Sequence, residues 1–333
     1  MSTQLDEPEA NAPAAIPPDG PPAAPAPKVR AGDRVFRALS AGSGAIVLIM
    51  MAAIAFFLVI KSIHALTSNQ ANFFTYSGWG PDNDPAMFGI AALAFHTLLT
   101  SLIALIIAVP VAVGIALFIT FYAPRKVAST LAYLVDLLAA VPSIVYGLWG
   151  VFFLAPQMTG LTLWLSKYFG WTVLFDYRPD NIPSNRSDFT AGIVLAIMIL
   201  PIVASLSREV FQRVPRTNIE AALALGATRW EMVRMSVLPF GRPGVVSASI
   251  LGLGRALGET LAVMMILSAV YEVNPHITES GGITFASNIA LKFGEAGAIG
   301  SSALIASGMV LFLITLIVNS IAQAILRRGM VKD

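Results

Sequence analysis

Residues 214–245, "VPRTNIEAALALGATRWEMVRMSVLPFGRPGV", contain two short amphipathic runs separated by a glycine. Gly226 ends the first run, because glycine tolerates the left-handed turn at a helix C-terminus. The second run, residues 228–237, is followed by Leu238 and Pro239, and a residue that precedes proline avoids the helical region. The segment therefore predicts two short helices that lie at an angle to each other on a surface.

The first of these runs has the features of a helix start. Thr217 or Asn218 can cap the helix, and Glu220 falls in its first turn, where a carboxylate is favoured. The alanines that follow are small enough to let a partner approach closely, and Arg229 and Arg234 supply positive charge around them. The surface that these helices form is therefore a candidate docking site.

The rest of the chain is strongly apolar. Its 333 residues are 56% hydrophobic and 12% charged, with a mean hydropathy of +0.75. Soluble domains carry about 25% charged residues, so this composition indicates a polytopic membrane protein. The chain has no cysteine, which excludes disulfides, thiolate metal sites and cysteine nucleophiles.

Six stretches are long enough to cross a membrane, since a crossing helix needs roughly 20 apolar residues. They are residues 43–66, 87–122, 128–155, 189–211, 244–270 and 300–326. The second stretch contains Pro110, but the part after this proline is too short to span alone, so we expect one long kinked helix. The predicted fold is all-α, a membrane bundle of six transmembrane helices.

The positions of the basic residues predict the orientation. With six crossings, one side of the membrane receives Lys28, Arg30, Arg34, Arg37, Arg125, Lys126, Arg208, Arg213, Arg216, Arg229, Arg234, Arg242, Arg327, Arg328 and Lys332. The other side receives only Lys61, Lys167, Arg178, Arg186 and Lys292. We therefore expect a multi-pass protein of the plasma (inner) membrane with both termini cytoplasmic.

Two opposite charges interrupt the fifth stretch, in the sequence "GLGRALGETLAV" (residues 252–263). Arg255 lies about 17 Å along the expected helix, near the bilayer midplane, and Glu259 follows one turn later on the same face. A central charge of this kind costs about 2.5–3.5 kcal/mol, so the pair must face protein or water. The pair is either a structural ion pair or part of a translocation path. Gly254 and Gly258, four residues apart, would let another helix approach closely.

Three more polar residues are candidates in the third stretch. Asp136 could pair with Arg255 or face cytoplasmic water, and we favour a structural role for it. Ser143 and Tyr146 follow Pro142 and could donate hydroxyl groups to an oxyanion. Hydroxyl groups in membrane helices also bond to backbone or to a neighbouring helix, so this alternative stays open.

The spacing around Gly226 carries a specific resemblance. Glu-Ala-Ala, three residues, Gly and then Leu-Pro twelve and thirteen residues later resembles the EAA loop of ABC-transporter permeases, although Ser236 stands where a branched apolar residue is usual. In that family the loop forms coupling helices that sit in a groove of the ATPase subunit. The resemblance implies a coupling set of Glu220, Ala221, Ala222, Gly226, Arg229, Leu238 and Pro239.

Longer stretches extend the resemblance. Residues 96–126, residues 134–156 and "GLGRALGET" resemble the permease subunits of the phosphate-specific importer, and the run 146–150 together with the long N-terminal region favours the PstC-type subunit. The resemblance implies a type I ABC importer permease fold, import of inorganic phosphate, and a substrate path that includes Arg255, Glu259, Ser143 and Tyr146. The composition of residues 1–30, rich in Pro and Ala without an apolar period, predicts a disordered cytoplasmic tail. We expect residues 31–86 to hold the first transmembrane helix and an external segment, and residues 87–330 to form the permease core with coupling helices at 214–240.

Several partners follow from the resemblance. We expect a second, PstA-type permease, an ATPase dimer, an external phosphate-binding protein docked on the loops 157–188 and 271–299, membrane lipid, and no nucleic acid. No G-x-x-x-x-G-K-[ST] motif occurs, so ATP would be hydrolysed by the partner, and the chain itself would bind no cofactor and would not be an enzyme. The scattered residues His64, His96 and His276 are expected to be structural.

Other functions remain open at this point. An ABC permease could import another oxyanion, such as molybdate or sulfate, and the residue chemistry does not separate these. An ion-coupled secondary transporter or channel could use Arg255, Glu259 and Asp136 as a charge relay, but it would need no docking helices. A membrane enzyme is the weakest alternative, because no nucleophile–base or metal cluster is present in the sequence.

Overall fold

The structure is a computed structural model that describes residues 31–176 and 185–330, and within these the side chains of residues 32–324. The predicted tail at 1–30 lies outside the described residues, as do the side chains of Lys28, Arg30, Arg178, Arg327, Arg328 and Lys332. The chain divides into two compact units, Met1–Ala53 and Ile54–Asp333. The described part of the first unit is the beginning of helix α1 (Ala31–Ser68), and the second unit contains all the other elements.

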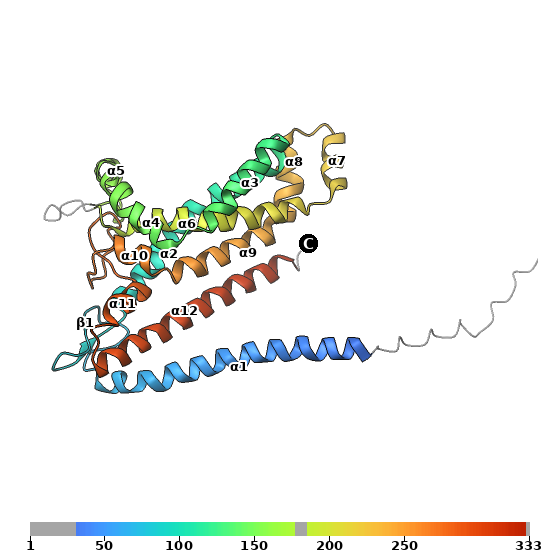
Figure 1. Cartoon of the computed structure of the whole chain (residues 1–333). Coiled ribbons are helices and arrows are strands. Elements are labelled where there is room, and N and C mark those ends of the chain that lie inside the picture. The colour runs from blue at the N-terminus through green and yellow to red at the C-terminus, as the bar shows by residue number, and fades with distance from the viewer. Residues whose placement is uncertain (1–30, 177–184, 331–333) are drawn as a thin grey trace, which may run out of the picture. The chain divides into compact units, whose positions relative to one another are not determined.

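Within its described residues, the second unit is mostly helical (Figure 1). A short antiparallel pair, β1 (Trp79–Gly80) and β2 (Met87–Phe88), follows α1 and pairs Trp79 with Phe88. The α-helices are α2 (Ala91–Leu117), α3 (Arg125–Ala139), α4 (Ser143–Trp149), α5 (Ala155–Phe169), α6 (Asp188–Gln212), α7 (Arg216–Ala224), α8 (Arg229–Met232), α9 (Leu238–Leu257), α10 (Leu261–Ile266), α11 (Phe285–Lys292) and α12 (Ala298–Met330). Three π-helical turns are η1 (Phe118–Tyr122), η2 (Gly150–Leu154) and η3 (Val233–Val237).

The described residues contain six helices that are long and apolar enough to cross a membrane, which confirms the predicted fold class. They are Gly32–Ser68, Ala91–Tyr122, Ser143–Phe169, Asp188–Gln212, Arg229–Leu257 and Ala298–Ala324. The second helix runs without interruption past Pro110, as expected. The bounds of the third and fifth spans differ from the prediction.

The predicted third span, 128–155, was placed too early in the chain. Helix α3 ends at Ala139, and a new helix begins at Ser143, because Pro142 cannot continue the hydrogen-bond ladder of α3. The membrane-length helix is Ser143–Phe169, so the first part of the expected external loop 157–188 is helical. Helix α3 is a separate amphipathic helix with no fully buried residue.

The predicted fifth span, 244–270, and the expected helix stop at Leu238–Pro239 were also wrong. The helix begins at Arg229, runs through Pro239 and ends at Leu257. It passes the proline because η3 widens the backbone just before it: the Leu238 amide donates to the Val233 carbonyl, five residues back. This wider turn moves the proline ring away from the carbonyl with which it would clash.

The same device recurs twice. Turn η1 ends two residues before Pro124, and η2 ends two residues before Pro156, as η3 does before Pro239. In each case the residue before the proline donates to a carbonyl five residues earlier. In two of the three cases, at Pro156 and Pro239, the helix continues through the proline.

Helix α6 lies at the centre of the second unit and packs against α2, α3 and α9. Its contact with α2 is made by a stripe of fully buried alanines spaced four residues apart, Ala104, Ala108, Ala112 and Ala116. Small side chains let two helix backbones approach closely. The resulting van der Waals contacts hold the helices together inside a bilayer, where the hydrophobic effect does not drive helices to associate. Gly252 likewise lets α9 approach α6 closely. A Cβ added at Gly252 would lie 2.9 Å from the Val203 side chain of α6.

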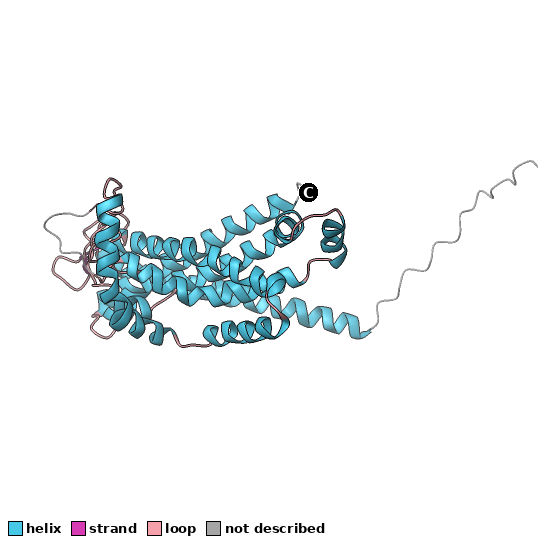
Figure 2. Cartoon of the chain, turned by 90° about the horizontal axis from the view of Figure 1, so that it is seen from above, coloured by secondary structure: helices cyan, strands magenta, loops and turns pink. Residues whose placement is uncertain are grey.

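Most of the loops gather at one end of the second unit (Figure 2), where Figure 1 places β1, α10 and α11. Here the buried His96 Nδ1 lies 2.7 Å from Asp188 Oδ2, and His96 Nε2 lies 2.7 Å from the Glu272 carbonyl oxygen. His96 therefore joins α2, α6 and the loop after α10, and these contacts support the structural role expected for it. In the same loop, burial raises the pKa of Tyr271 to about 12. The Tyr271 hydroxyl donates to Asn288 Oδ1 in α11.

Candidate functional site

Arg255 and Glu259 do not lie on one helix face as predicted. Helix α9 ends at Leu257, with Gly258 as its C-cap, and Glu259 follows in the break before α10. The cause is the glycine, whose high conformational freedom makes it a poor helix residue. Arg255 is exposed, whereas Glu259 is only 8% exposed and its Oε1 accepts a hydrogen bond from the Ala262 amide at 3.3 Å. Glu259 therefore stabilises the start of α10, and the described residues contain no ion pair between the two.

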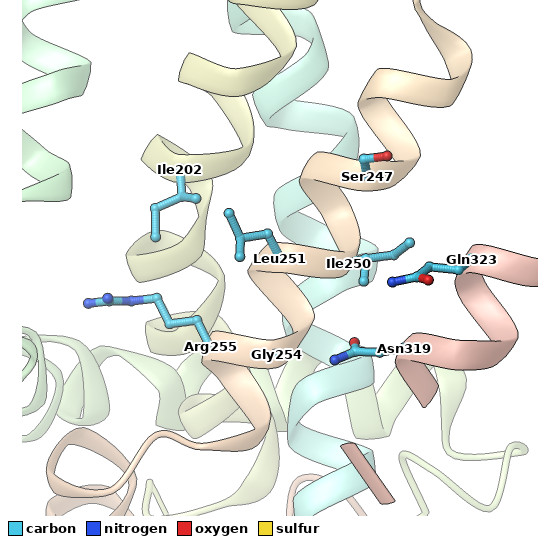
Figure 3. Close-up of a pocket in the computed structure, with 8 residues that line it drawn as sticks. All are labelled: Ile202, Ser247, Ile250, Leu251, Gly254, Arg255, Asn319 and Gln323. Carbon is cyan, nitrogen blue, oxygen red and sulfur yellow. The ribbon is translucent and has the colours of Figure 1, made fainter. Parts of the chain in front are cut away.

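Arg255 borders a pocket of about 600 Å³ between α6, α9 and α12 (Figure 3). Its walls include Ile202, near the middle of α6, and Ser247, Ile250, Leu251 and Gly254 of α9. The Arg255 side chain extends on the side of α9 opposite to α12. No carboxylate among the described residues lies within ion-pair distance of this guanidinium.

Two amides on α12 complete the pocket, and the sequence analysis missed them. Asn319 and Gln323 are four residues apart and point from α12 toward α9 (Figure 3). Asn319 Oδ1 is buried and accepts no hydrogen bond from any group that the structure describes. The signal was present in the sequence, because both amides interrupt the apolar stretch 300–326 at helical spacing.

The structure places Tyr146 near Arg255, close enough for an electrostatic interaction between the two side chains. The buried Tyr146 hydroxyl donates to the Leu138 carbonyl at 2.8 Å, which ties α4 to the end of α3. This bond uses the proton of the Tyr146 hydroxyl. To donate to an anion, the hydroxyl would first have to break its hydrogen bond to the Leu138 carbonyl. Ser143 is half-buried at the first position of α4.

The two broken helices meet at α4 and α10. These elements pack so closely that a Cβ at Gly147 would lie 2.8 Å from the Ala262 Cα atom. Helix α4 follows the break at Pro142, and α10 follows the break at Gly258. The interruption after Arg255 and the interruption before Tyr146 therefore lie in one region of the bundle.

Asp136 pairs with Arg208 and not with Arg255. The distance between Arg208 Nη2 and Asp136 Oδ2 is 3.2 Å, and this contact joins α3 to α6. The Asp136 side chain remains half-exposed. This ion pair supports the structural role that the sequence favours for Asp136.

Gly254 and Gly258 have no close neighbour within the described chain. A Cβ added at Gly254 would meet nothing within 4 Å, and one at Gly258 would meet only the Gly254 carbonyl oxygen. The predicted close approach of another helix is therefore not made by this chain's own described helices.

The first predicted surface helix is present as α7, whereas the second, residues 228–237, is the beginning of the fifth spanning helix, which starts with α8. Gly226 has φ +84° between them, the left-handed value expected for a glycine that ends a helix. The Gly226 amide donates to the Leu223 carbonyl, and the Ala227 amide donates to the Ala222 carbonyl, which closes the turn. The predicted caps at Thr217 and Asn218 are wrong, because α7 already begins at Arg216, after Pro215.

Thr228 caps α8, a feature that the sequence analysis did not identify. Its hydroxyl accepts from the Glu231 amide, while the Glu231 carboxylate accepts from the Thr228 amide. Ala222 is buried against Met232 and Phe211, so α7 and the start of the fifth span are anchored to the end of α6. Leu238 and Pro239 lie inside the spanning helix, not at the end of a surface helix.

The outward side of α7 and α8 carries several large apolar residues. Leu225 is 89% exposed and Trp230 is 58% exposed, and both lie close in sequence to Gly226. Glu220, Ala221 and Arg229 are exposed with them. Figure 1 places this surface at the end of the second unit opposite to β1 and α11. An exposed apolar patch with a polar rim is typical of a protein-docking surface.

Comparison with known proteins agrees with this arrangement. Residues 108–331 match the family described as "Binding-protein-dependent transport system inner membrane component". The chain is 48% identical over 298 residues to the phosphate transport system permease protein PstC 2 of Mycobacterium tuberculosis, covering 89% of this chain and 92% of that protein. It is 39% identical over 297 residues to PstC of Xylella fastidiosa, covering 89% and 91%.

Solved structures support the fold. A chain of a bacterial alginate ABC transporter, solved with its alginate-bound periplasmic protein, aligns with a TM-score of 0.58 at 17% identity, covering 89% of this chain and 95% of that chain. A chain of the MetNI methionine ABC transporter in an inward-facing conformation aligns with a TM-score of 0.51 at 18% identity, covering 72% and 96%. The chain therefore belongs to the binding-protein-dependent transport system inner membrane components, and within them to the PstC permease proteins.

Proposed function

We propose that this chain is a transmembrane subunit of an ATP-driven importer of inorganic phosphate. The observation that carries the proposal is Arg255, an exposed guanidinium within a spanning helix with no carboxylate partner in the described chain, in a protein 48% identical to a phosphate permease. Phosphate carries one to two negative charges, and an apolar path would reject it. An arginine can offset that charge and bind two phosphate oxygens at once.

The proposed substrate path follows the side of α9 that carries Arg255. Tyr146 and Ser143 lie on α4, beside the break that follows Arg255, and offer hydroxyl groups. Asn319, with its unsatisfied amide oxygen, and Gln323 border the same pocket as Arg255, from α12. Glu259 contributes by holding the break between α9 and α10, through its bond to the Ala262 amide, instead of by pairing directly with Arg255.

The path is completed by a second permease of the PstA type. Arg255 is exposed, and Gly254 has open space where a side chain would be, so a neighbouring helix can come close to this face of α9. An external phosphate-binding protein would deliver the substrate at the end that carries α11. Both termini would then be cytoplasmic, on the side of α7 and α8.

An ATPase dimer would dock on α7 and α8. The exposed Leu225 and Trp230 supply apolar contact area, and Arg229 and Glu220 supply charge around it. When the ATPases close on ATP, they would pull these helices together. Because Ala222 and Met232 are packed on the end of α6, that movement would reach the central helix and open the path to alternate sides. ATP would be used by the partner, and this chain would bind no cofactor.

The substrate is tested by competition. Membrane vesicles that contain the complete importer should take up radiolabelled phosphate, and excess unlabelled phosphate should suppress this uptake. Excess sulfate or molybdate should leave it unchanged. Suppression by either of these anions at the same concentration would instead assign the chain to another oxyanion.

A further inference from the structure

Two arginines in the first half of the fifth span have no ion-pair partner among the residues that the structure describes. Arg234, in η3, and Arg242, in α9, are both exposed, and no carboxylate in the described ranges forms an ion pair with either. Neither residue belongs to the proposed phosphate path, which lies more than a helical turn further along α9.

The two arginines border a pocket of about 360 Å³ between α2 and α9. Its other walls are apolar and comprise Val113 of α2 and Leu238, Pro239, Val245 and Val246 of the fifth span. The pocket therefore combines two positive groups with a hydrocarbon-like interior.

The depth of this pocket matches the headgroup layer of a bilayer. The helix Arg229–Leu257 has 29 residues and is about 43 Å long, whereas the hydrocarbon core is about 30 Å thick. All its charged residues except Arg255 lie between Arg229 and Arg242, so this is the end that protrudes. Residues 243–254 carry no charge, so the apolar part of the helix begins just after Arg242, with Val245 and Val246 on the hydrocarbon side.

We propose that this pocket binds one anionic phospholipid, with the phosphate between Arg234 and Arg242 and an acyl chain along Val113, Val245 and Val246. Charge complementarity favours an anionic headgroup, since each basic residue near a membrane surface attracts one. A protein segment fits less well, because most of the apolar walls belong to membrane-spanning helices. The exposed apolar surface suited to the ATPase lies instead around Leu225 and Trp230.

The test is native mass spectrometry of the full chain released from nanodiscs with equal amounts of phosphatidylcholine and phosphatidylglycerol. The wild type should retain phosphatidylglycerol in preference to phosphatidylcholine. Arg234→Gln/Arg242→Gln should weaken phosphatidylglycerol binding roughly 30-fold. The matched control Arg125→Gln/Arg216→Gln removes the same charge from exposed residues outside the pocket and should bind like the wild type.

Four results would overturn the proposal. The first is equal retention of the two lipids by the wild type. The second is equal loss of phosphatidylglycerol in the pocket and control variants. The third is complete loss of the lipid from the wild type once the ATPase is assembled, which would make the pocket a protein interface. If the double glutamine variant does not insert, Arg234→Lys/Arg242→Lys keeps both charges and should keep the preference. A lysine variant without any preference would also contradict the proposal.

Discussion

Arg255 and Glu259 are separated by the end of a helix: the guanidinium is exposed on α9, and the carboxylate is buried beyond Gly258, where it accepts from the Ala262 amide. The two charges therefore have different surroundings, although they are only four residues apart. Substitutions at the two positions should consequently have different effects.

Replacing Arg255 should abolish transport without affecting assembly. Arg255→Gln removes the only charge that we place against phosphate in this chain's part of the path. We therefore expect the rate of uptake to fall at least tenfold, which corresponds to an increase of about 1.4 kcal/mol or more in the activation free energy of transport. Arg255→Lys keeps the charge but loses the forked donor geometry and should be intermediate. Initial rates of phosphate uptake and co-purification of the partners measure both effects. Normal uptake by the glutamine variant would make Arg255 a structural residue.

Glu259 should tolerate an isosteric amide better than a truncation. Gln can still accept a hydrogen bond from the Ala262 amide, whereas Ala cannot, and losing a helix cap of this kind costs about 1 kcal/mol. We expect Glu259→Gln to retain most of the uptake and thermal stability, and Glu259→Ala to lose part of both. If the two variants lose uptake equally while remaining stable, the negative charge itself acts in transport.

The turn at Gly226 should require a residue that accepts a positive φ. An added Cβ there meets nothing within 4 Å in the described chain, so a defect within this chain arises from backbone strain at φ +84°. Gly226→Val should change the angle between α7 and α8 and reduce co-purification of the ATPase several-fold. Gly226→Asn is the matched control, because asparagine visits this region more readily. Loss of the ATPase with asparagine as well would show that side-chain bulk, and not the turn, decides docking.

His96→Leu should destabilise the protein by about 3 kcal/mol, because it leaves the buried Asp188 carboxyl without its partner. His276→Leu is the control: its ring contacts the Asp176 carbonyl at an exposed position and should matter little. Thermal unfolding of the full chain in detergent compares the two. Similar melting temperatures for the wild type and His96→Leu would show that His96 does not hold α2 and α6 together.

Asp82 should contribute to the start of α12. Its carboxylate accepts from the Gly297 and Gly300 amides at 2.9 and 2.8 Å, and so satisfies two donors at the N-terminal end of this helix. Asp82→Ala should lower the free energy of unfolding by about 1 kcal/mol. Hydrogen exchange at residues 297–302 should increase in this variant, and unchanged exchange would show that the carboxylate is dispensable there.

The sequence predicts the class of the fold well because bilayer thickness dictates the length of apolar segments. It located all six spans approximately, together with Gly226 and the first surface helix. It misplaced the third and fifth spans at prolines, since one residue type has two outcomes: Pro142 ends a helix, whereas Pro239 is accommodated by the π-helical turn η3. Local sequence does not distinguish these outcomes, because they depend on packing against α6 and α2.

The candidate site shows the same limit. Arg255 could be singled out because a charge in an apolar segment needs an explanation, and Asn319 and Gln323 could have been found by the same argument. The separation of Arg255 from Glu259 could not be predicted, because helical spacing assumes that the helix continues through Gly258. The pairing of Asp136 with Arg208, 72 residues away, depends on the packing of α3 on α6.

The most direct test of the central claim is phosphate uptake into vesicles that contain this chain with its second permease, the ATPases and the binding protein. The measurement compares vesicles loaded with ATP with vesicles loaded with ADP, with all ion gradients collapsed. We predict phosphate accumulation only with ATP. Accumulation without ATP, driven by a restored proton or sodium gradient, would contradict the account and would favour an ion-coupled transporter.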